Sequence, residues 1–277
     1  MPTLILNKNE ILNLMKMKDV IAVVENAFRD WTKGLADMPS KSYISVNDGD
    51  FRAMPAALPG AAGMKWVNVH PGNRDKGLPS VMALIIYNDT ATGYPLAIMD
   101  GTDITAYRTG ATAAIAAKYL AKKDSNILGI IGAGRQAETQ ILAHAELYNF
   151  KEIRAYDIFP EAIERLRSHL LGFNIVSMPI EKVMEADIVC TLTTAHAPVV
   201  KKEWLKPGTH INAIGADAEG KEELEPAILR MATVVVDDFR QAVHAGEINV
   251  PISKGWYRKE EVYATLGDLI LGKKKGR

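Results

Sequence analysis

The sequence predicts an α/β protein: a Rossmann-type, doubly wound parallel sheet domain preceded by an N-terminal α+β domain. Three observations favour this fold. The chain has 277 residues, which is room for about two domains. Its second half alternates short apolar runs with helical stretches, a rhythm typical of βαβ units. A glycine-rich turn joins the first of those runs to a helix.

The first domain is expected to span residues 1–122. Apolar residues at three- and four-residue steps between Val20 and Trp31 predict an amphipathic helix. From about Ser42 to Met99, short apolar runs separated by Pro, Gly, Asn and Asp indicate a sheet with turns. The alanine-rich segment from Thr105 to Leu120 predicts a long buried helix that leads to the domain junction.

The second domain is expected to span residues 123–277, with strands and helices in alternation. This order predicts a parallel sheet, because parallel neighbours need crossover connections. The predicted strands are Asn126–Ile131, Glu152–Tyr156, Ile188–Thr191, His210–Ala213 and Val234–Val236.

Composition excludes several classes of protein. Apolar residues make up 48% and charged residues 24%, which is typical of globular proteins. Basic and acidic residues number 33 each, which argues against nucleic-acid or membrane partners. Cys190 is the single cysteine, so an intrachain disulfide is excluded. No apolar stretch nears the ~20 residues of a membrane span, and the N-terminus has no signal-peptide pattern. We expect a cytoplasmic protein.

The turn after the first predicted strand of the second domain fits a dinucleotide. Gly132-Ala-Gly134-Arg135-Gln136-Ala137 forms G-x-G-x-x-A between a strand and a helix. The glycines allow a tight turn and close approach of a pyrophosphate, which the helix N-terminus stabilises. Asp157, at the end of the next predicted strand and 25 residues after Gly132, is suited to a ribose diol. It favours NAD over NADP, although Arg154 could reach the same region.

The first domain supplies a candidate site for an anionic substrate. Lys41, Arg52, Lys65 and Arg108 are basic, and the last three stand among apolar or small neighbours without acids in their short segments. A buried cation needs an anion nearby, and arginine is suited to a carboxylate or phosphate. Taken singly, a cation of this kind is more often a surface charge with a buried stem; taken together, the four suggest an anionic ligand.

In the second domain, an acidic loop follows the strand that ends at Ala213. Ligands of open α/β sheets bind beyond the carboxyl ends of the strands. Asp217 is the candidate acid/base, with Glu219 as the next acid in the loop and turn or capping duty as the alternative. His70 is a second candidate proton carrier, although a structural histidine in a turn fits its surroundings better. No cluster has zinc-ligand spacing, so no metal is expected.

Several segments together resemble the ornithine cyclodeaminase/μ-crystallin family, most closely its archaeal alanine dehydrogenase branch. They occur in order along nearly the whole chain: Phe51-Arg-Ala-Met-Pro55, Lys65 to Asn73, Gly77-Leu-Pro79, Arg108-Thr-Gly-Ala111, Gly132-Ala-Gly134, Ala213 to Asp217 with Gly220-Lys221, and His244-Ala-Gly-Glu-Ile248.

The resemblance implies roles for individual residues. Arg52, Lys65 and Arg108 would bind an amino-acid carboxylate, Lys41 and Lys65 would act as catalytic lysines, and Asp217 would handle protons. Cofactor contacts are expected from the following residues: Gly132, Gly134, Arg135, Gln136, Asp157, Ser80, Thr109 and Arg108. Members of the family usually continue past the position of Arg277 with a segment that returns to the first domain, and this chain ends there.

The implied activity is NAD-dependent, reversible oxidative deamination of L-alanine to pyruvate and ammonia by a homodimer. The segment from Arg52 to Lys65 contains no acid, whereas cyclodeaminases use one near there to hold a distal amine. A small apolar side chain therefore fits better than that of ornithine. The alternatives are an ornithine cyclodeaminase that forms proline, a cyclic imine or ketimine reductase, and a non-enzymatic, crystallin-like binding protein.

Overall fold

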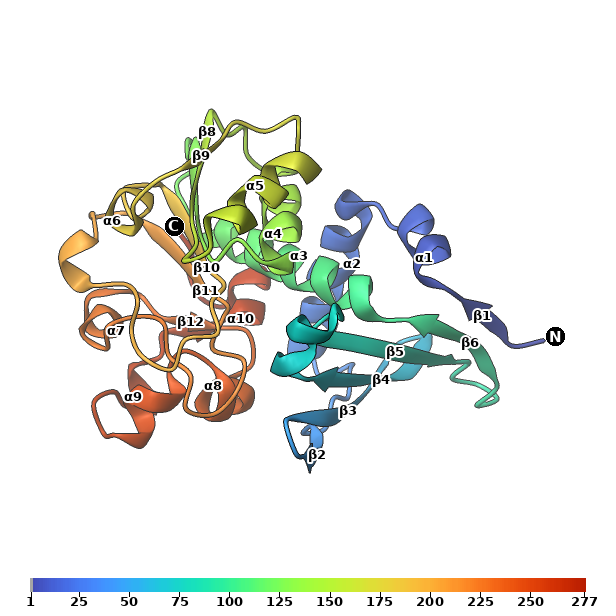
Figure 1. Ribbon diagram of the computed structural model, residues 1–277. Helices are drawn as coiled ribbons and strands as arrows, with labels where there is room; N and C mark the ends of the chain where they lie inside the picture. The colour runs from blue at the N-terminus through green and yellow to red at the C-terminus, as the bar shows by residue number, and fades with distance from the viewer. Residues whose placement is uncertain (1) are drawn as a thin grey trace. The chain divides into compact units, whose positions relative to one another are not determined.

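The computed structural model describes residues 2–277, and these form two compact units, the first ending at Arg108 and the second spanning Thr109–Arg277 (Figure 1). The division falls inside helix α3 (Thr102–Leu120), whereas the sequence places the junction after that helix. The second part of α3 belongs to the core of the second unit, where Ala117 and Ala121 are buried. The Tyr148 hydroxyl donates to the Ala117 carbonyl at 2.8 Å.

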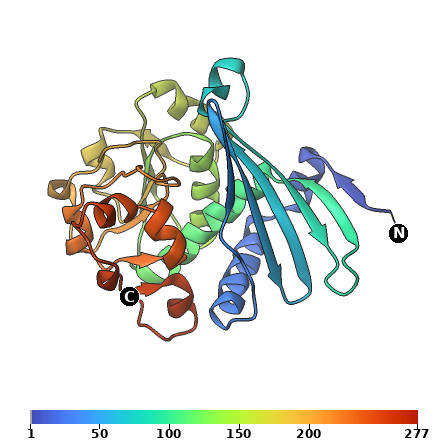
Figure 2. The same cartoon turned by 90° about the horizontal axis from the view of Figure 1, so that it is seen from below.

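The first unit contains a six-stranded sheet, with two helices between its first and second strands along the chain (Figure 2). The strand order is β1-β6-β5-β4-β3-β2, with β1 parallel to β6 and the other neighbours antiparallel. The elements are β1 (Leu4–Leu6), α1 (Lys8–Leu14), α2 (Met17–Thr32), β2 (Ser42–Val46), β3 (Gly49–Leu58), β4 (Ala61–Val69), the 3₁₀ helix η1 (Pro71–Lys76), β5 (Val81–Asn88) and β6 (Pro95–Asp100).

The two faces of this sheet differ in burial. Cross-strand partners share a face, and the register places Arg52, Val67, Ala83 and Ala97 on one face. All four are buried. The start of α3 covers part of this face, since a Cβ at Gly101 would meet the side chains of both Ile85 and Ala83.

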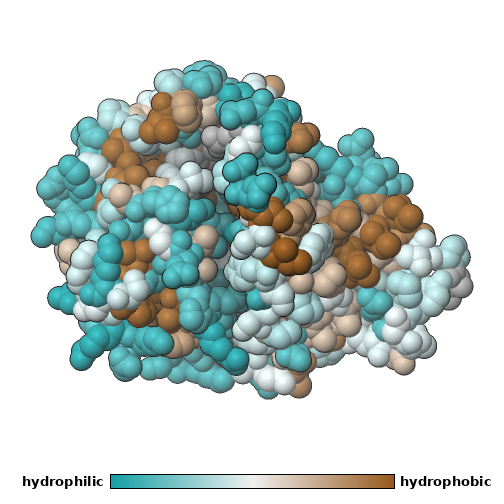
Figure 3. Space-filling model, turned by 60° about the horizontal axis from the view of Figure 1, so that its bottom comes forward, coloured by the Kyte–Doolittle hydropathy of each residue, from teal (hydrophilic) through white to brown (hydrophobic). Residues whose placement is uncertain are grey.

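The opposite face is open and apolar. The register places Ile5, Ile44 and Leu84 there, and these side chains are 78%, 55% and 52% exposed. Phe51 and Trp66 stack on the same face with ring centroids 5.6 Å apart. Apolar side chains gather on the surface of the first unit in Figure 3.

The second unit contains a five-stranded, all-parallel sheet in the order β11-β10-β7-β8-β9. When the five strands are numbered along the chain, with β7 as strand 1, the order read from the β9 edge is 3-2-1-4-5. This is the arrangement of a dinucleotide-binding sheet. The elements are β7 (Ile127–Ile131), α4 (Arg135–Ala145), β8 (Glu152–Tyr156), α5 (Pro160–His169), β9 (Ile175–Ser177), α6 (Ile180–Val183), β10 (Ile188–Thr191), the 3₁₀ helix η2 (Lys202–Trp204), β11 (His210–Ala213) and α7 (Ala227–Met231).

Helices cover both faces of this sheet. Residues of α3, α4 and α5 form one core with Leu128, Ile130 and Cys190. Residues of α6 and α7 form another with Ile131 and Val189. Successive residues of one strand, such as Ile130 and Ile131, therefore point into opposite cores, as a doubly wound sheet requires. The predicted Rossmann-type fold is confirmed.

The C-terminal part forms a small additional cluster around Leu229, Ile248 and Tyr257. Its elements are β12 (Val235–Val236), α8 (Phe239–Ala245), α9 (Asn249–Ser253), the 3₁₀ helix η3 (Lys259–Glu261), β13 (Ala264–Thr265) and α10 (Leu266–Ile270). The predicted strand near Val234 pairs with β13 rather than extending the parallel sheet. Strand β9 was not predicted, because three residues are too few to show a period. None of the helices within residues 2–277 combines the length and apolar character that crossing a bilayer requires.

Candidate active site

The glycine turn after β7 lies at the point where the strand order reverses, between β7 and β10. Gly132 has φ = 96°, and a Cβ there would lie 3.0 Å from the Leu192 carbonyl carbon and oxygen. Only glycine combines that backbone conformation with so close an approach. A Cβ at Gly134, in contrast, would have no neighbour within 4 Å. The turn is therefore tight against β10 and open at the start of α4, as a phosphate-binding turn needs.

Asp157 follows β8 and is tied to this turn. Its Oδ2 accepts a hydrogen bond from the Ala133 backbone N–H at 2.7 Å, and its Oδ1 accepts one from Phe159 N–H at 2.9 Å. Arg154 does not compete for the same place. Its Nε binds Glu152 Oε1 at 2.5 Å and its Nη1 lies 3.8 Å from Glu185 Oε2. The Arg154 guanidinium is therefore already paired with acids of this protein and does not support the alternative in which it binds a 2′-phosphate.

The remaining predicted cofactor contacts are distributed over both units. Arg135 and Gln136 begin α4; Arg135 is exposed, and the Gln136 Oε1 atom is buried without a hydrogen-bond partner. Ser80 precedes β5 in the first unit. Thr109 is the first residue of the second.

The structure brings together the four predicted cations of the first unit. Arg52 on β3 and Lys65 on β4 share the covered face of the sheet, because Arg52 pairs with Val67 and Met54 pairs with Lys65. Arg108 on α3 and Lys41 before β2 both lie close enough to act electrostatically on Lys65. These residues are far apart in sequence, so the positive cluster is a product of the fold.

Lys65 is the most perturbed of these groups. Burial lowers its pKa to about 6, and the positive charges of Arg108, Lys41 and Arg52 act in the same direction. A buried amine surrounded by like charges gives up its proton readily. The negative charge of a carboxylate beside Lys65 would favour the protonated amine, so the cluster is suited to an anionic group.

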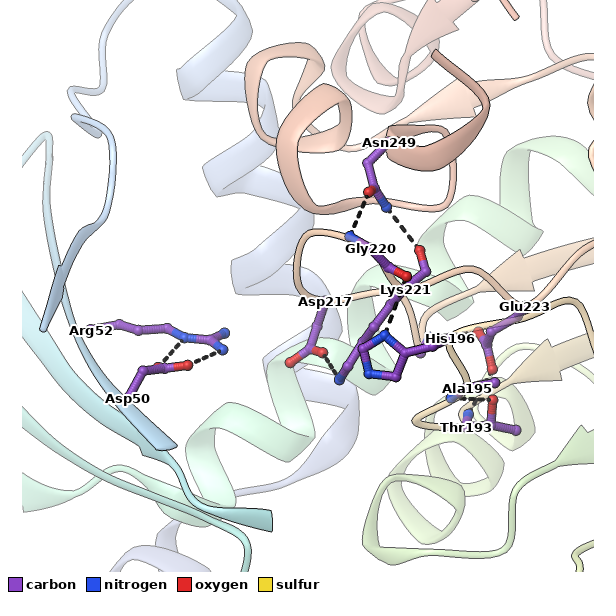
Figure 4. Close-up of polar contacts among 11 residues, drawn as sticks. Asp50, Arg52, Thr193, Ala195, His196, Asp217, Gly220, Lys221, Glu223 and Asn249 are labelled. Atoms are coloured by element: carbon purple, nitrogen blue, oxygen red, sulfur yellow. Dashed lines mark hydrogen bonds and ion pairs between the residues drawn. The ribbon is translucent and has the colours of Figure 1, made fainter. Parts of the chain in front are cut away.

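Arg52 has an acid beside it, Asp50, which lies just outside the short segment Phe51–Pro55 in which the sequence shows no acid. Its Nε and Nη2 bind the two carboxylate oxygens of Asp50 at 2.6 and 2.9 Å (Figure 4). The guanidinium also lies over the Tyr43 ring, 5.5 Å from its centroid. Asp50 stands two residues before Arg52 and therefore on the same face of β3. It holds the Arg52 side chain in a fixed orientation.

Asp217, the predicted acid/base, lies on the exposed loop after β11. Its Oδ1 accepts a hydrogen bond from Lys221 Nζ at 2.5 Å (Figure 4). Asn249 fixes the same loop, since its Oδ1 accepts from Gly220 N–H and its Nδ2 donates to the Lys221 carbonyl. His196 Nδ1 lies 3.3 Å from the Gly220 carbonyl oxygen. The loop that carries Asp217 is thus braced from two sides.

Sequence reasoning missed two acids of the second unit, Glu223 and Glu247. Glu223 is fully buried and joins the carboxyl ends of β10 and β11, and Glu247 accepts its backbone N–H. Glu247 lies in the segment His244-Ala-Gly-Glu-Ile248 that carries the family resemblance, which was the available signal, whereas Glu223 lies two residues beyond Gly220-Lys221. Among residues 2–277, no group of three or more His, Cys, Asp or Glu side chains is placed to hold a metal ion.

Comparison with known proteins then identifies the family. A sequence profile of the ornithine cyclodeaminase/mu-crystallin family matches residues 1–277. The chain belongs to this family. The alanine dehydrogenase of Archaeoglobus fulgidus is 50% identical over 279 residues, covering 100% of this chain and 87% of that protein.

Two solved structures share the fold over nearly the whole of this chain. An archaeal alanine dehydrogenase dimer with bound NAD has a TM-score of 0.97 at 50% identity, covering 100% of this chain and 87% of its own. The Δ1-pyrroline-2-carboxylate reductase of Thermococcus litoralis, in complex with NADH and L-proline, has a TM-score of 0.95 at 40% identity, covering 99% and 88%. The predicted family is confirmed.

Proposed function

We propose that this protein catalyses the reversible, NAD-dependent oxidative deamination of L-alanine to pyruvate and ammonia. The observation that carries the proposal is the buried Lys65 among Arg52, Lys41 and Arg108, in a chain whose second unit has a dinucleotide-binding turn. The cation cluster suits a small carboxylate, and the dinucleotide-binding turn suits a redox cofactor. The 50% identity to an alanine dehydrogenase supports the same substrate.

NAD fits the second unit. The turn at Gly132 is closed against β10 and open above Gly134, and the Asp157 carboxylate stands at the end of the next strand. A carboxylate at that position accepts hydrogen bonds from a ribose diol and repels a 2′-phosphate. Gly132, Gly134 and Asp157 would hold the cofactor, with Arg135, Gln136, Ser80, Thr109 and Arg108 as further contacts. When bound, NAD supplies the acceptor for the hydride that leaves the substrate Cα.

Lys65 and Arg52 bind the substrate carboxylate. Arg52 is held in place by Asp50, so little side-chain entropy is lost when it meets an anion. Lys65 becomes fully protonated only when the carboxylate arrives, because burial and like charges lower its pKa in the free protein. Arg108 and Lys41 add positive charge around the same group. Fixing the carboxylate at two points orients Cα, and such positioning supplies a large part of many barriers.

Asp217 moves the proton. Oxidation of an amino acid gives an imine, and water attacks that imine to release ammonia. A carboxylate that takes the proton of the water accelerates this step, an effect worth roughly 10²–10⁴-fold. Lys221 donates a hydrogen bond to Asp217 Oδ1 and so orients the carboxylate.

Reduction of a cyclic imine is the second candidate function. The 40% identity to a Δ1-pyrroline-2-carboxylate reductase favours it, and the same carboxylate receptor and cofactor turn serve both reactions. The two activities differ at the imine carbon: alanine deamination adds water there and releases ammonia, whereas a cyclic imine only accepts a hydride. The carboxylate-binding residues on β3 and β4 do not distinguish the two reactions. An ornithine cyclodeaminase fits less well, since residues 53–64 contain no acid to hold a distal amine.

Absorbance at about 340 nm, where NADH absorbs and NAD does not, tests the proposal. Purified protein is incubated with NAD and L-alanine, and in parallel with L-ornithine. NADH that accumulates with alanine alone supports the dehydrogenase. Ammonia and proline released from ornithine without net NADH would assign the cyclodeaminase instead. Absence of both signals, with NADH consumed by Δ1-pyrroline-2-carboxylate, would assign the reductase.

We also propose that the open face of the first sheet joins two copies of the chain. Ile5, Ile44 and Leu84 expose more than half of their surface on that face, which is unusual for a monomer. The similar archaeal alanine dehydrogenase is described as a dimer. Light scattering coupled to size exclusion measures the mass. A dimer that Leu84→Lys converts to a monomer is expected, and a monomeric wild type would contradict this.

A further inference from the structure

We propose that Glu223 is a positioning residue: it fixes the carboxyl ends of β10 and β11 in the arrangement that the cofactor turn and Asp217 require. Glu247 holds Glu223 in turn. This inference rests on the proposed NAD-dependent function, and it assigns a role to two acids that contact neither the expected substrate nor the expected cofactor.

Glu223 joins two strand ends through three hydrogen bonds. Its Oε2 accepts from Thr191 Oγ1 at 2.6 Å and from the Gly215 backbone N–H at 2.7 Å, and its Oε1 accepts from Thr193 N–H at 2.6 Å. Thr191 ends β10, and Gly215 lies two residues beyond β11. Glu223 has no exposed surface. A fully buried carboxylate is retained only where such bonds offset the cost of its desolvation.

The fit around this carboxylate leaves no room for movement. A Cβ at Gly215 would lie 2.5 Å from the Glu223 carboxyl carbon and 2.2 Å from the Thr193 carbonyl oxygen. Position 215 therefore accepts only glycine, for lack of space rather than for its dihedral angles. The ends of β10 and β11 therefore pack closely around the Glu223 carboxylate.

The strand ends that Glu223 joins contact both functional elements of the second unit, which are the cofactor turn at Gly132 and the loop of Asp217. On one side, the Leu192 carbonyl group and the Thr193 N atom are the atoms nearest to a Cβ at Gly132, at 3.0 and 3.3 Å, so the cofactor turn rests on the backbone that Glu223 holds. On the other side, the Asp217 N–H donates to the Gly215 carbonyl at 2.9 Å. A shift of Glu223 would displace the support of Gly132 and the loop of Asp217 together.

Glu247 extends the support outward. It lies between α8 and α9, and its Oε1 accepts hydrogen bonds from Glu223 N–H at 2.9 Å and Leu224 N–H at 2.7 Å. Burial raises the pKa of both acids, that of Glu247 to about 8. The backbone partners of Glu223 are N–H donors that cannot reverse their role, so an amide at this position would set an NH₂ group against at least one of them.

Asp187 provides a matched control. Its carboxylate also joins two strands of the same sheet, because Oδ2 accepts from Asn126 N–H at 2.9 Å and from Ile127 N–H at 3.0 Å. These bonds lie at the amino ends of β7 and β10, the edge opposite to the cofactor turn. A role that is only structural would make Glu223→Gln and Asp187→Asn behave alike.

The test compares NADH binding, kcat and amide hydrogen exchange in the wild type, Glu223→Gln and Asp187→Asn. Both variants should unfold at lower temperature. Well below that temperature, Glu223→Gln should bind NADH about tenfold more weakly or worse and lose kcat, with faster exchange at the Thr193 and Gly215 amides. Asp187→Asn should keep the Kd for NADH and kcat of the wild type.

A folded Glu223→Gln protein whose NADH affinity and kcat equal those of Asp187→Asn would overturn the inference. If Glu223→Gln does not fold, Thr191→Val is the variant that decides, because it removes one hydrogen-bond donor to Glu223 and keeps the shape of the side chain. NADH binding about threefold weaker than in the wild type is then expected. Unchanged NADH binding would overturn the inference. NADH binding to the wild-type protein is measured before any variant is made. A wild-type protein that does not bind NADH would refute the proposed function itself.

Discussion

Arg52 and Lys65 stand on one face of the first unit's sheet, yet their electrostatic surroundings are opposite. Asp50 binds two nitrogens of Arg52, whereas Lys65 is buried among the charges of Arg108, Lys41 and Arg52. One cation is thus permanently charged and oriented. For the other, burial and like charges favour the neutral amine, so binding of an anion beside it would be coupled to proton uptake.

The affinity for pyruvate should therefore fall as the pH rises. The pKa of Lys65 is about 6 in the free protein, so above pH 6 binding must add a proton, and Kd rises by up to tenfold per pH unit. Kd for pyruvate in the enzyme–NADH complex, without ammonium, is measured by fluorescence between pH 6 and 8.5. In Lys65→Arg, whose guanidinium stays protonated, the profile should flatten. A flat wild-type profile would show that Lys65 does not take up this proton.

Replacement of Asp217 should affect the reaction and spare the cofactor. Asp217→Asn keeps the size of the side chain and removes its basicity, so we expect kcat to fall by roughly 10²–10⁴-fold. The Kd for NADH should stay within about twofold, because Asp217 is not a cofactor contact. Glu219→Gln, on the same loop, is the matched control and should retain activity. If Asp217→Asn keeps full activity, another group moves the proton.

Asp157 should set both the affinity for NAD and the discrimination against NADP. In Asp157→Asn, one of the two bonds to Ala133 N–H and Phe159 N–H meets an amide donor, and the negative charge that repels a 2′-phosphate is lost. We expect kcat/KM for NAD to fall about tenfold and the NAD/NADP ratio to fall with it. Equal ratios in the variant and the wild type would assign cofactor choice to other residues. Glu152→Gln, on the same strand, serves as the control.

Acid should destabilise the second unit through two buried histidines. His144 Nδ1 bonds the Gln140 carbonyl, its Nε2 lies 3.1 Å from Asn212 Nδ2, and Asn212 Oδ1 lies 3.1 Å from His210 Nε2. Burial lowers the pKa of both histidines to about 4. Unfolding exposes them at the ordinary value of about 6.5 and so takes up protons.

Their contribution to stability is complete above pH 6.5 and is lost as the pH falls toward 4. Urea unfolding at pH 7.5, 6 and 5 should show a stability loss that grows below pH 6.5. His210→Gln should reduce this pH dependence, since one of the two titrating groups is removed. His169→Gln, an exposed control (side chain 61% exposed), should not change it. A pH dependence that His210→Gln leaves intact would place the acid sensitivity elsewhere.

Local patterns were enough to predict the dinucleotide half of the fold. The strand of Ile127–Ile131, the turn at Gly132 and the helix of Ala137 are adjacent in sequence, and glycine spacing fixes their geometry. Even Asp50 was within reach, since a period of two puts it beside Arg52 on one face of a strand.

Contacts between distant segments could not be predicted in this way. Glu223 meets Thr191 and Gly215 only because β10 and β11 are neighbours in the sheet, and no spacing along the chain encodes that. The lowered pKa of Lys65 likewise depends in part on α3, whose Arg108 acts on it electrostatically after folding. The division of the chain inside α3 has the same origin, because which core a helix joins is decided by packing rather than by its own composition.

The proposed function requires that NADH reduce a small 2-oxo acid in the presence of ammonia. The most direct measurement is the loss of absorbance at about 340 nm with NADH, ammonium and pyruvate, beside a parallel reaction with NADH and Δ1-pyrroline-2-carboxylate. Rapid NADH loss with pyruvate that depends on ammonium, and a much slower loss with the cyclic imine, is the expected result. Loss of NADH with the cyclic imine alone would contradict the claim and make the protein an imine reductase.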